Sequence, residues 1–283
     1  MTDPDIGVVV STLVADPLTC TGAELLAAVA AAEEVGIGQY MMWPHHISST
    51  DLPDSAERIA AWTGRVRVLE GATGFTRGAT PRFIEEVQGL VDLAVRLGVP
   101  MIATCTLRAQ IEDLSAAAEG LAAFGEAAAR AGVDLCLEFL PWTAIPTLAA
   151  AWALVQQTGL DGVGLVLDTW HFQRQPGGPD NDVLESIPGD RIRYVQISDA
   201  GAVPDTDLMT EALTRRLLPG DGVIDFDRLH SSLAAIGADP VYATEVYNTT
   251  LALTGAHDMA LALQQAARGM PLGRSGAIAR GDA

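Results

Sequence analysis

The 283-residue sequence contains no lysine, so all 17 of its basic residues are arginine. A Schiff-base aldolase, a pyridoxal-phosphate enzyme and a Walker-type nucleotide binder each need a lysine, and these three classes are therefore excluded. Positive charge is scarce as well, because the 17 arginines stand against 36 acidic residues and leave a net charge of −19. A surface this acidic would repel a polyanion, so we expect no nucleic-acid partner.

Cysteine is rare, and Cys20, Cys105 and Cys136 form no CxxC pair. This pattern argues against a disulfide framework or a thiolate metal site and predicts a reducing compartment. The first residues lack the basic and apolar regions of a signal peptide, and no apolar run approaches the roughly 18 residues of a membrane-spanning helix. We therefore expect a cytoplasmic protein without a membrane partner.

Apolar residues make up 49% of the chain, which is enough for a sizeable core. Short apolar runs alternate with longer segments rich in Ala, Leu and Glu, a pattern typical of repeated strand and helix units. The expected strands are Ile6–Ser11, Gly38–Trp43, Val66–Glu70, Pro100–Thr104, Val133–Glu138, Val163–Asp168, Ile192–Ile197 and Val241–Glu245. Expected helices include Gly22–Val35, Pro81–Leu97, Ala109–Arg130, Thr147–Thr158, Phe226–Ile236 and Ala256–Ala267.

Eight such units in one chain favour an α/β fold with a single (β/α)8 TIM barrel. An open Rossmann-type sheet is the alternative, but no strand is followed by GxGxxG, so we expect no dinucleotide site. We expect the barrel to span 1–267, a flexible C-terminal tail to span 268–283, and Ser198–Ile224 to form an extended loop after the seventh strand.

Polar residues end four consecutive predicted strands, namely Glu138, Asp168, Gln196 and Glu245. In a barrel these ends meet on one rim, where three carboxylates and an amide oxygen would repel one another unless a cation lay among them. Oxygen ligands favour Mn²⁺ or Mg²⁺, while Co²⁺ and Zn²⁺ stay open. The alternative is that each acid caps a helix or pairs with an arginine.

Further candidates surround this rim. His171 lies three residues beyond Asp168, where it can donate a hydrogen bond to a substrate or move a proton. The other candidates are two histidines after the second strand, an arginine pair suited to a carboxylate or phosphate, and tryptophans suited to a ring-shaped substrate. These substrate-binding candidates are His45, His46, Arg215, Arg216, Trp43, Trp142 and Trp170.

At LEFLP, LDTWH, YVQISDA, LLPGDGVIDF and TEVYN the chain resembles the xylose isomerase-like TIM barrel superfamily, the sugar phosphate isomerase/epimerase group. The resemblance implies that Glu138, Asp168 and Glu245 bind a divalent metal and that the two glutamates act as acid and base. It also implies that His171 contacts substrate. Sugar epimerases of the group normally have His where this chain has Gln196, whereas members that look like 3-dehydroshikimate dehydratase carry Gln there.

We therefore expect an enzyme that uses one divalent metal ion to remove a proton α to a carbonyl of a small polyhydroxylated or cyclic hydroxy-ketone substrate. Return of the proton gives isomerase or epimerase chemistry, and loss of a β-hydroxyl gives a dehydratase. Two alternatives stay open: a catalytically silent barrel that binds a small molecule, and a relative of metal-dependent hydrolases and nucleases. Assembly into a homo-oligomer also stays open.

Overall fold

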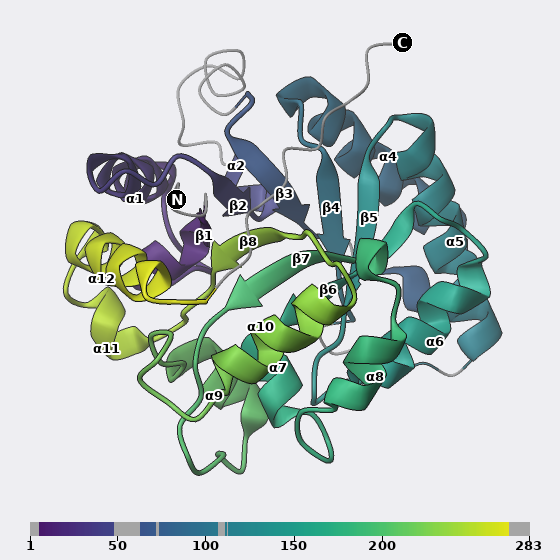
Figure 1. Ribbon diagram of the computed structural model, residues 1–283. Helices are drawn as coiled ribbons and strands as arrows, with labels where there is room; N and C mark the ends of the chain where they lie inside the picture. Colours follow the sequence, from purple (N-terminus) through teal and green to yellow (C-terminus); the bar gives the residue numbers. More distant parts are fainter. Residues whose placement is uncertain (1–5, 48–62, 72–73, 107–110, 112, 272–283) are drawn as a thin grey trace.

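Parallel strands pair in their order along the chain, and the last strand pairs with the first to close a barrel (Figure 1). The computed structural model describes residues 6–47, 63–71, 74–106, 111 and 113–271. The strands are β1 Gly7–Val9, β2 Tyr40–Met42, β3 Val66–Glu70, β4 Met101–Thr104, β5 Asp134–Glu138, β6 Val163–Asp168, β7 Ile192–Ile197 and β8 Val241–Thr244. The predicted (β/α)8 barrel is confirmed.

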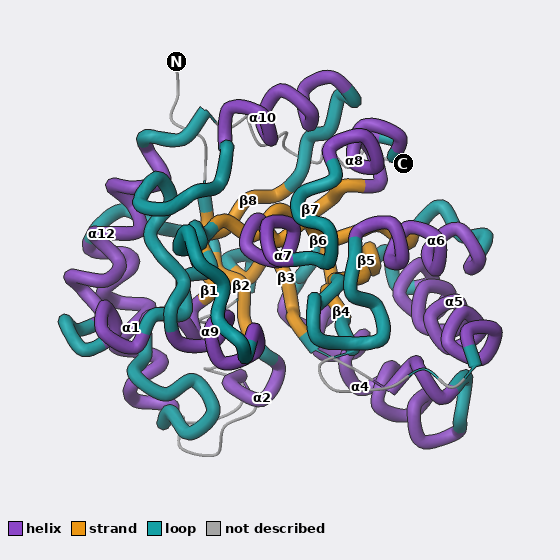
Figure 2. The backbone as a smooth tube through the Cα atoms, turned by 90° about the horizontal axis from the view of Figure 1, so that it is seen from below, coloured by secondary structure: helices purple, strands orange, loops and turns teal. Residues whose placement is uncertain are grey.

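Helices surround the ring of strands (Figure 2). They are α1 Gly22–Glu34, α2 Pro44–Ile47, α4 Pro81–Leu97, α5 Leu114–Arg130, α6 Leu148–Thr158, α7 Thr169–Arg174, α8 Asn181–Ser186, α9 Leu208–Thr214, α10 Phe226–Ala235, α11 Thr249–Ala252 and α12 Ala256–Arg268. Short 3₁₀ helices add Val10–Leu13, Gly74–Arg77 and Gly189–Arg191. No helix in the described ranges has the length and apolar character needed to cross a membrane.

Local capping sets the helix ends. Helix α4 has its predicted bounds, because the Thr80 hydroxyl accepts the Phe83 N–H at 3.3 Å and Gly98 ends the helix with a φ of 66°. Helix α5 was expected to begin at Ala109, which lies outside the described residues. The described helix begins at Leu114, because the Asp113 carboxylate before it accepts backbone N–H groups of the first turn.

The segment Ser198–Ile224 is an extended connection after β7, as expected, although it contains the short helix α9. Asp199 holds this connection together. Its backbone exchanges two hydrogen bonds with Leu217, each at 2.9 Å. Its buried carboxylate accepts the backbone N–H groups of Ala200, Gly220, Gly222 and Ile224 at 2.7–3.0 Å. The neighbouring Arg216 is thereby fixed at the carboxyl end of the barrel.

The barrel interior contains an apolar layer of alternate strand residues. Its buried members are Val9, Met41, Val68, Met101, Ala103, Cys136, Val166, Tyr194, Val241 and Ala243. Since successive strand residues point to opposite faces, residues two positions further along a strand point into the same interior. The predicted end of the barrel near residue 267 stays a prediction. Helix α12 ends at Arg268, and residues 272–283 of the predicted tail lie outside the described part of the chain.

Candidate active site

The inward-facing positions become polar at the carboxyl ends of the strands. Residues two positions apart on a strand share a face. On five strands, the residue two positions after a member of the apolar layer is polar and therefore also points into the barrel. These residues are Glu70 on β3, Glu138 on β5, Asp168 on β6, Gln196 on β7 and Glu245 just after β8. The Glu245 N–H donates to the Ile197 carbonyl at 2.9 Å, which extends the pairing of β7 and β8 to this residue. The fold thus aligns the four predicted strand-end residues and adds Glu70.

Arg216 forms ion pairs with two of these acids. Its Nη1 lies 2.6 Å from Asp168 Oδ2 and 3.0 Å from Glu245 Oε2, and its side chain is almost fully buried. The Arg216 Nε donates to the Ala212 carbonyl at 2.8 Å. The role predicted for Arg216 was an anion clamp for substrate, which stays a prediction. Its position shows that its charge is already balanced by two carboxylates.

His171 lies between the carboxylates of β5 and β6. Its Nε2 is 3.2 Å from Glu138 Oε1 and 3.8 Å from Asp168 Oδ2. Asp168 also begins helix α7, because its Oδ1 accepts the His171 N–H at 2.8 Å, and this bond sets the direction of the histidine. Glu138, Asp168 and His171 each offer a ligand atom, and the three atoms lie within 4.8 Å of one another. The trio is therefore a candidate cation site.

Gln196 is held by a second group of bonds. Its Nε2 donates to Glu70 Oε1 at 3.1 Å and to Glu245 Oε1 at 3.0 Å. The Tyr194 hydroxyl also donates to Glu70 Oε1, at 2.9 Å. These bonds connect β3 with β7 and β8 across the interior of the barrel.

Burial and neighbouring charges shift the acidity of this cluster. Burial, together with the charge of Glu138, raises the pKa of Glu70 to about 8, and burial raises the pKa of Glu245 well above its usual range. Burial acts in the same direction on Asp168, but the charges of Arg216 and His171 outweigh it and lower the pKa of this carboxyl. Asp168 therefore stays ionised, whereas Glu70 and Glu245 hold protons more readily.

The donor set fits a divalent cation. The predicted ligands Glu138, Asp168, Gln196 and Glu245 all offer oxygen atoms, as a hard cation requires. Three buried polar atoms of the cluster have no hydrogen-bond partner among the described residues, namely Gln196 Oε1, Glu70 Oε2 and His171 Nδ1. Because a buried polar atom without a partner is costly, the two oxygens favour a ligand that accepts their lone pairs.

Aromatic side chains lie beside the acids. Trp43 stacks on His46, with ring centroids 5.2 Å apart and an interplanar angle of 16°, and lies 5.4 Å from His45. The Tyr247 ring lies 6.3 Å from that of Trp43. The guanidinium of Arg216, which pairs with Asp168 and Glu245, lies 5.6 Å from the centre of the Tyr247 ring. The predicted residues after the second strand are therefore connected to the cluster through Tyr247.

The remaining substrate-binding candidates lie in different surroundings. Trp142 and Trp170 both pack against His171, at 5.3 and 5.4 Å between ring centroids. Trp170 is fully buried, with Arg216 above its ring at 5.5 Å. Arg215 has an exposed side chain that forms an ion pair with Asp205. Contacts of these residues with substrate stay predictions.

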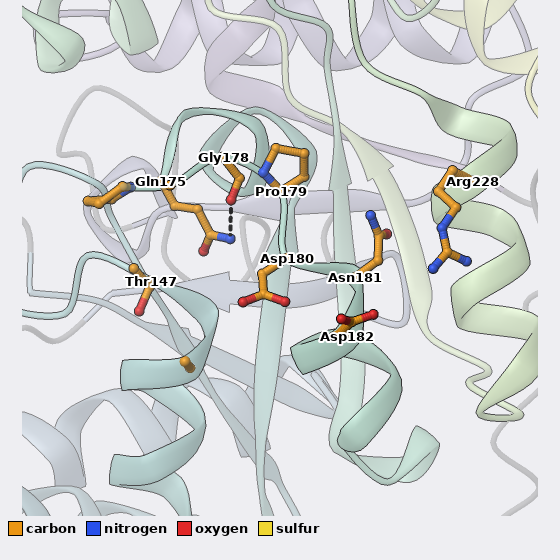
Figure 3. Close-up of a pocket in the computed structure, with 11 residues that line it drawn as sticks. Thr147, Gln175, Gly178, Pro179, Asp180, Asn181, Asp182 and Arg228 are labelled. Atoms are coloured by element: carbon orange, nitrogen blue, oxygen red, sulfur yellow. Dashed lines mark hydrogen bonds between the residues drawn. The ribbon is translucent and has the colours of Figure 1, made fainter.

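A cavity of about 400 Å³ lies elsewhere on the molecule, between the starts of α6, α8 and α10 (Figure 3). None of the predicted site residues lines it. Gln175 connects its walls, because its Nε2 donates to the Gly178 carbonyl and its Oε1 accepts the Leu148 N–H, both at 2.9 Å. This cavity is separate from the strand-end acids, and we assign it no function.

Two residues at the site, Glu70 and Tyr247, were not predicted from the sequence. Glu70 is the last residue of a strand that was predicted with correct bounds, so the rule that selected Glu138 and Asp168 also applied to it. Tyr247 lies two positions beyond Glu245, and its hydroxyl is 2.7 Å from Ser11 Oγ on the neighbouring connection. A systematic check of every strand end would have found Glu70, whereas Tyr247 carries no comparable signal.

The sequence profile described as xylose isomerase-like TIM barrel matches residues 76–269. The inosose isomerase of Bacillus velezensis is 30% identical over 214 residues, which cover 72% of this chain and 75% of that protein. The 3-dehydroshikimate dehydratase of Pseudomonas putida is 26% identical over 178 residues, which cover 62% of this chain and 28% of the dehydratase. Among solved structures, the IOLI protein with a bound zinc atom superposes with a TM-score of 0.73 and 22% identity, covering 91% of this chain and 94% of that one.

Proposed function

Because the chain belongs to the xylose isomerase-like TIM barrel family, we propose that it is a divalent-metal-dependent enzyme that removes a proton α to a carbonyl. Its substrate would be a small polyhydroxylated or cyclic hydroxy-ketone. One observation carries the proposal: Glu138, Asp168 and Gln196 end or lie near the ends of β5, β6 and β7, Glu245 directly follows β8, and all four share the inward face. Two of the similar proteins are an inosose isomerase and a 3-dehydroshikimate dehydratase. Isomerisation and dehydration can both begin with this proton abstraction.

Glu138, Asp168, Gln196 and Glu245 would hold the cation; ligand atoms of Glu138 and Asp168 lie within 4.8 Å of each other and of His171. When bound, a divalent ion supplies a Lewis acid that polarises the substrate carbonyl and stabilises negative charge on its oxygen. The buried Gln196 Oε1, which has no partner among the described residues, supports this assignment. Mn²⁺ and Mg²⁺ suit the oxygen-rich set best, while the zinc in the IOLI protein keeps Zn²⁺ open.

Glu138 and Glu245 would exchange protons with the substrate. They come from β5 and β8, which are not neighbours in the barrel, so they can approach a substrate from different sides. One glutamate takes the α proton, and the electron pair of the C–H bond forms an enolate, which is an enediolate where the α carbon carries a hydroxyl. Return of a proton to the former carbonyl carbon, with transfer of the α-hydroxyl proton to the former carbonyl oxygen, gives an isomer. Departure of a β-hydroxyl, which leaves as water with a proton from the second glutamate, gives a dehydrated product.

His171 would assist this proton exchange. Its Nε2, 3.2 Å from Glu138 Oε1, is placed to donate a hydrogen bond to that glutamate or to a substrate oxygen beside it. Phe139, Trp142 and Trp170 surround the ring and keep it in this orientation. The histidine therefore has a fixed position, as a group that orients substrate requires.

The neighbourhood favours a hydroxylated ring. Tyr247 lies next to Arg216, and Trp43, His45 and His46 form an aromatic group beside Tyr247; such groups suit the apolar face of a cyclic polyol. The charge of Arg216 is balanced by Asp168 and Glu245, which favours recognition of hydroxyl groups over a carboxylate held by this arginine.

The decisive experiment incubates the purified protein and Mn²⁺ in D₂O with two panels, one of inososes and ketohexoses and one of cyclic β-hydroxy ketones, and follows them by NMR. We expect deuterium at the carbon next to the carbonyl in at least one compound. Olefinic signals in addition would identify a dehydratase, and exchange without them an isomerase. Glu245→Gln should abolish the exchange, whereas Glu119→Gln on the exposed face of α5 should not. Mn²⁺ binding without exchange in either panel would contradict the proposed reaction.

A further inference from the structure

We propose that Glu70 is a positioning residue that fixes the amide of Gln196 with its oxygen toward the candidate cation site. The inference rests on the proposed function, and it assigns a role to an acid on β3 that lies outside the four strands of the predicted ligand set. Three observations carry it: the donors around Glu70, the two acceptors around the Gln196 nitrogen, and the unpaired Gln196 oxygen.

The first step concerns the amide nitrogen. A side-chain amide has two N–H groups, and Gln196 donates one to Glu70 Oε1 at 3.1 Å and one to Glu245 Oε1 at 3.0 Å. If the amide were turned by half a rotation while both acids are ionised, its carbonyl oxygen would face two carboxylate oxygens. Two hydrogen bonds would be lost and replaced by repulsion. The two acids therefore select one of the two orientations that the amide can adopt.

The second step concerns the amide oxygen. With the nitrogen held by Glu70 and Glu245, Oε1 points to the remaining side, where no described residue donates to it. Gln196 is only 2% exposed, so bulk water does not replace the missing partner. Leaving a buried acceptor without a partner destabilises the folded protein. A divalent cation is a suitable partner, because an amide oxygen is a hard ligand.

Glu70 and Glu245 differ in the partners that they hold. Glu245 belongs to the predicted ligand set and is also paired with Arg216, so its position serves several partners. Among the described residues, the donors to Glu70 Oε1 both come from β7, namely the Tyr194 hydroxyl and the Gln196 amide. Tyr194 precedes Gln196 by two positions on the same face of that strand. Glu70 is thus held by one residue of β7 and in turn holds the next inward residue.

The test uses two substitutions at one position. In Glu70→Gln, the new amide oxygen can accept the same two hydrogen bonds while the negative charge is removed. In Glu70→Leu, a side chain of similar size accepts none. Titration calorimetry with Mn²⁺ alone should show about 10–100-fold weaker binding for Glu70→Leu, the loss usual for a residue that orients a metal ligand, and binding within about threefold of wild type for Glu70→Gln.

The outcomes are distinguishable. Equal weakening in both variants would mean that the charge of Glu70 matters, and unchanged affinity in Glu70→Leu would mean that Gln196 needs no orientation; each overturns the inference and leaves the proposed function intact. Absence of Mn²⁺ binding to wild type would overturn both.

A second test needs no metal and holds even if Glu70→Leu fails to fold. Gln196→Glu places a carboxylate oxygen where the amide nitrogen lies, within about 3 Å of two other carboxylates, so the melting temperature in EDTA should fall. Adding Glu70→Gln returns a donor between positions 70 and 196, and the double variant should recover at least half of the loss. Glu119→Gln combined with Gln196→Glu serves as the control and should recover none. Additive effects of Glu70→Gln and Gln196→Glu would overturn the inference.

Discussion

Arg216 compensates negative charge in a cluster that contains four carboxylates. It contacts Asp168 at 2.6 Å and Glu245 at 3.0 Å. Burial lowers the pKa of its guanidinium, but the charges of Asp168 and Glu245 outweigh burial and raise it overall, so the side chain stays protonated. A buried carboxylate without a partner is strongly destabilising. The arginine therefore allows the acids to be in place before any cation binds.

His171 should be required for turnover and dispensable for cation binding. Replacing it with Asn removes the ring nitrogen 3.2 Å from Glu138, so turnover should fall by about 100-fold or more while Mn²⁺ affinity stays near wild type. Steady-state kinetics and titration calorimetry measure the two effects. The matched control is His257→Asn on the exposed face of α12, which should change neither. Loss of Mn²⁺ binding would make His171 a ligand, as its closeness to Glu138 and Asp168 also permits.

The stability of the metal-free protein should depend on the ionisation of Glu70. Burial raises the pKa of this acid from an ordinary 4.5 to about 8, so between these values the folded state binds a proton that the unfolded state has lost. The contribution of Glu70 is therefore largest at low pH and disappears as the pH rises through about 8. In EDTA, the melting temperature of wild type should fall more steeply between pH 5 and 8.5 than that of Glu70→Gln. Parallel slopes would contradict the shift.

In the connection after β7, Asp199 helps to position Arg216, whose own backbone is bonded to Tyr247 and Asn248. The Asp199 carboxylate accepts four backbone N–H groups, and its own backbone pairs with Leu217 beside the arginine. Gly222 makes this arrangement possible, because a Cβ there would lie 2.3 Å from both Asp199 Oδ1 and the Ala200 carbonyl oxygen. The site thus depends on a close backbone approach just beyond the end of β7.

Gly222→Ala should therefore destabilise the protein by about 1–3 kcal/mol, the usual effect of forcing an atom into packed surroundings. It should also weaken Mn²⁺ binding, since Arg216 and its two carboxylates shift with the connection. Urea unfolding and titration calorimetry measure both. Gly201→Ala in the same connection provides the control, because a Cβ at Gly201 meets nothing within 4 Å. Equal effects of the two substitutions would show that Asp199 does not depend on this approach.

The bounds of a strand or helix could be predicted from the sequence where neighbouring residues determine them. Strand β6 and helix α4 have their predicted bounds, since a short apolar run and capping residues act over a few positions. The partners of Arg216 were not predictable, because they lie 48 and 29 positions away and are brought together only when the barrel closes. Its charge and its position before LLPGDGVIDF suggested a substrate anion, and nothing local distinguishes that role from the observed pairing with two acids.

For the whole molecule, cation binding should be visible as thermal stability. At Mn²⁺ about 100 times its dissociation constant, the melting temperature should rise by about 5–10 °C, since the ion binds only the folded state, and EDTA should reverse the rise. Glu245→Gln should reduce the shift, because it removes a charged ligand, while Glu119→Gln should retain it in full. Calorimetry that detects no divalent ion on wild type would contradict the prediction.

The order of strands around the barrel has a consequence for how such a protein can diverge. The proposed reaction uses β5 to β8, which form one continuous half of the ring and of the chain, whereas β1 to β4 supply Trp43 and its neighbours on the wall. The substrate-facing residues of β1 to β4 can therefore change while β5 to β8 retain the residues of the proposed reaction. The hydrogen bond from Gln196 to Glu70 limits this freedom. A chimera that takes its first four strands from a relative would inherit new selectivity with intact reactivity only if the exchanged strand offers an acceptor at position 70.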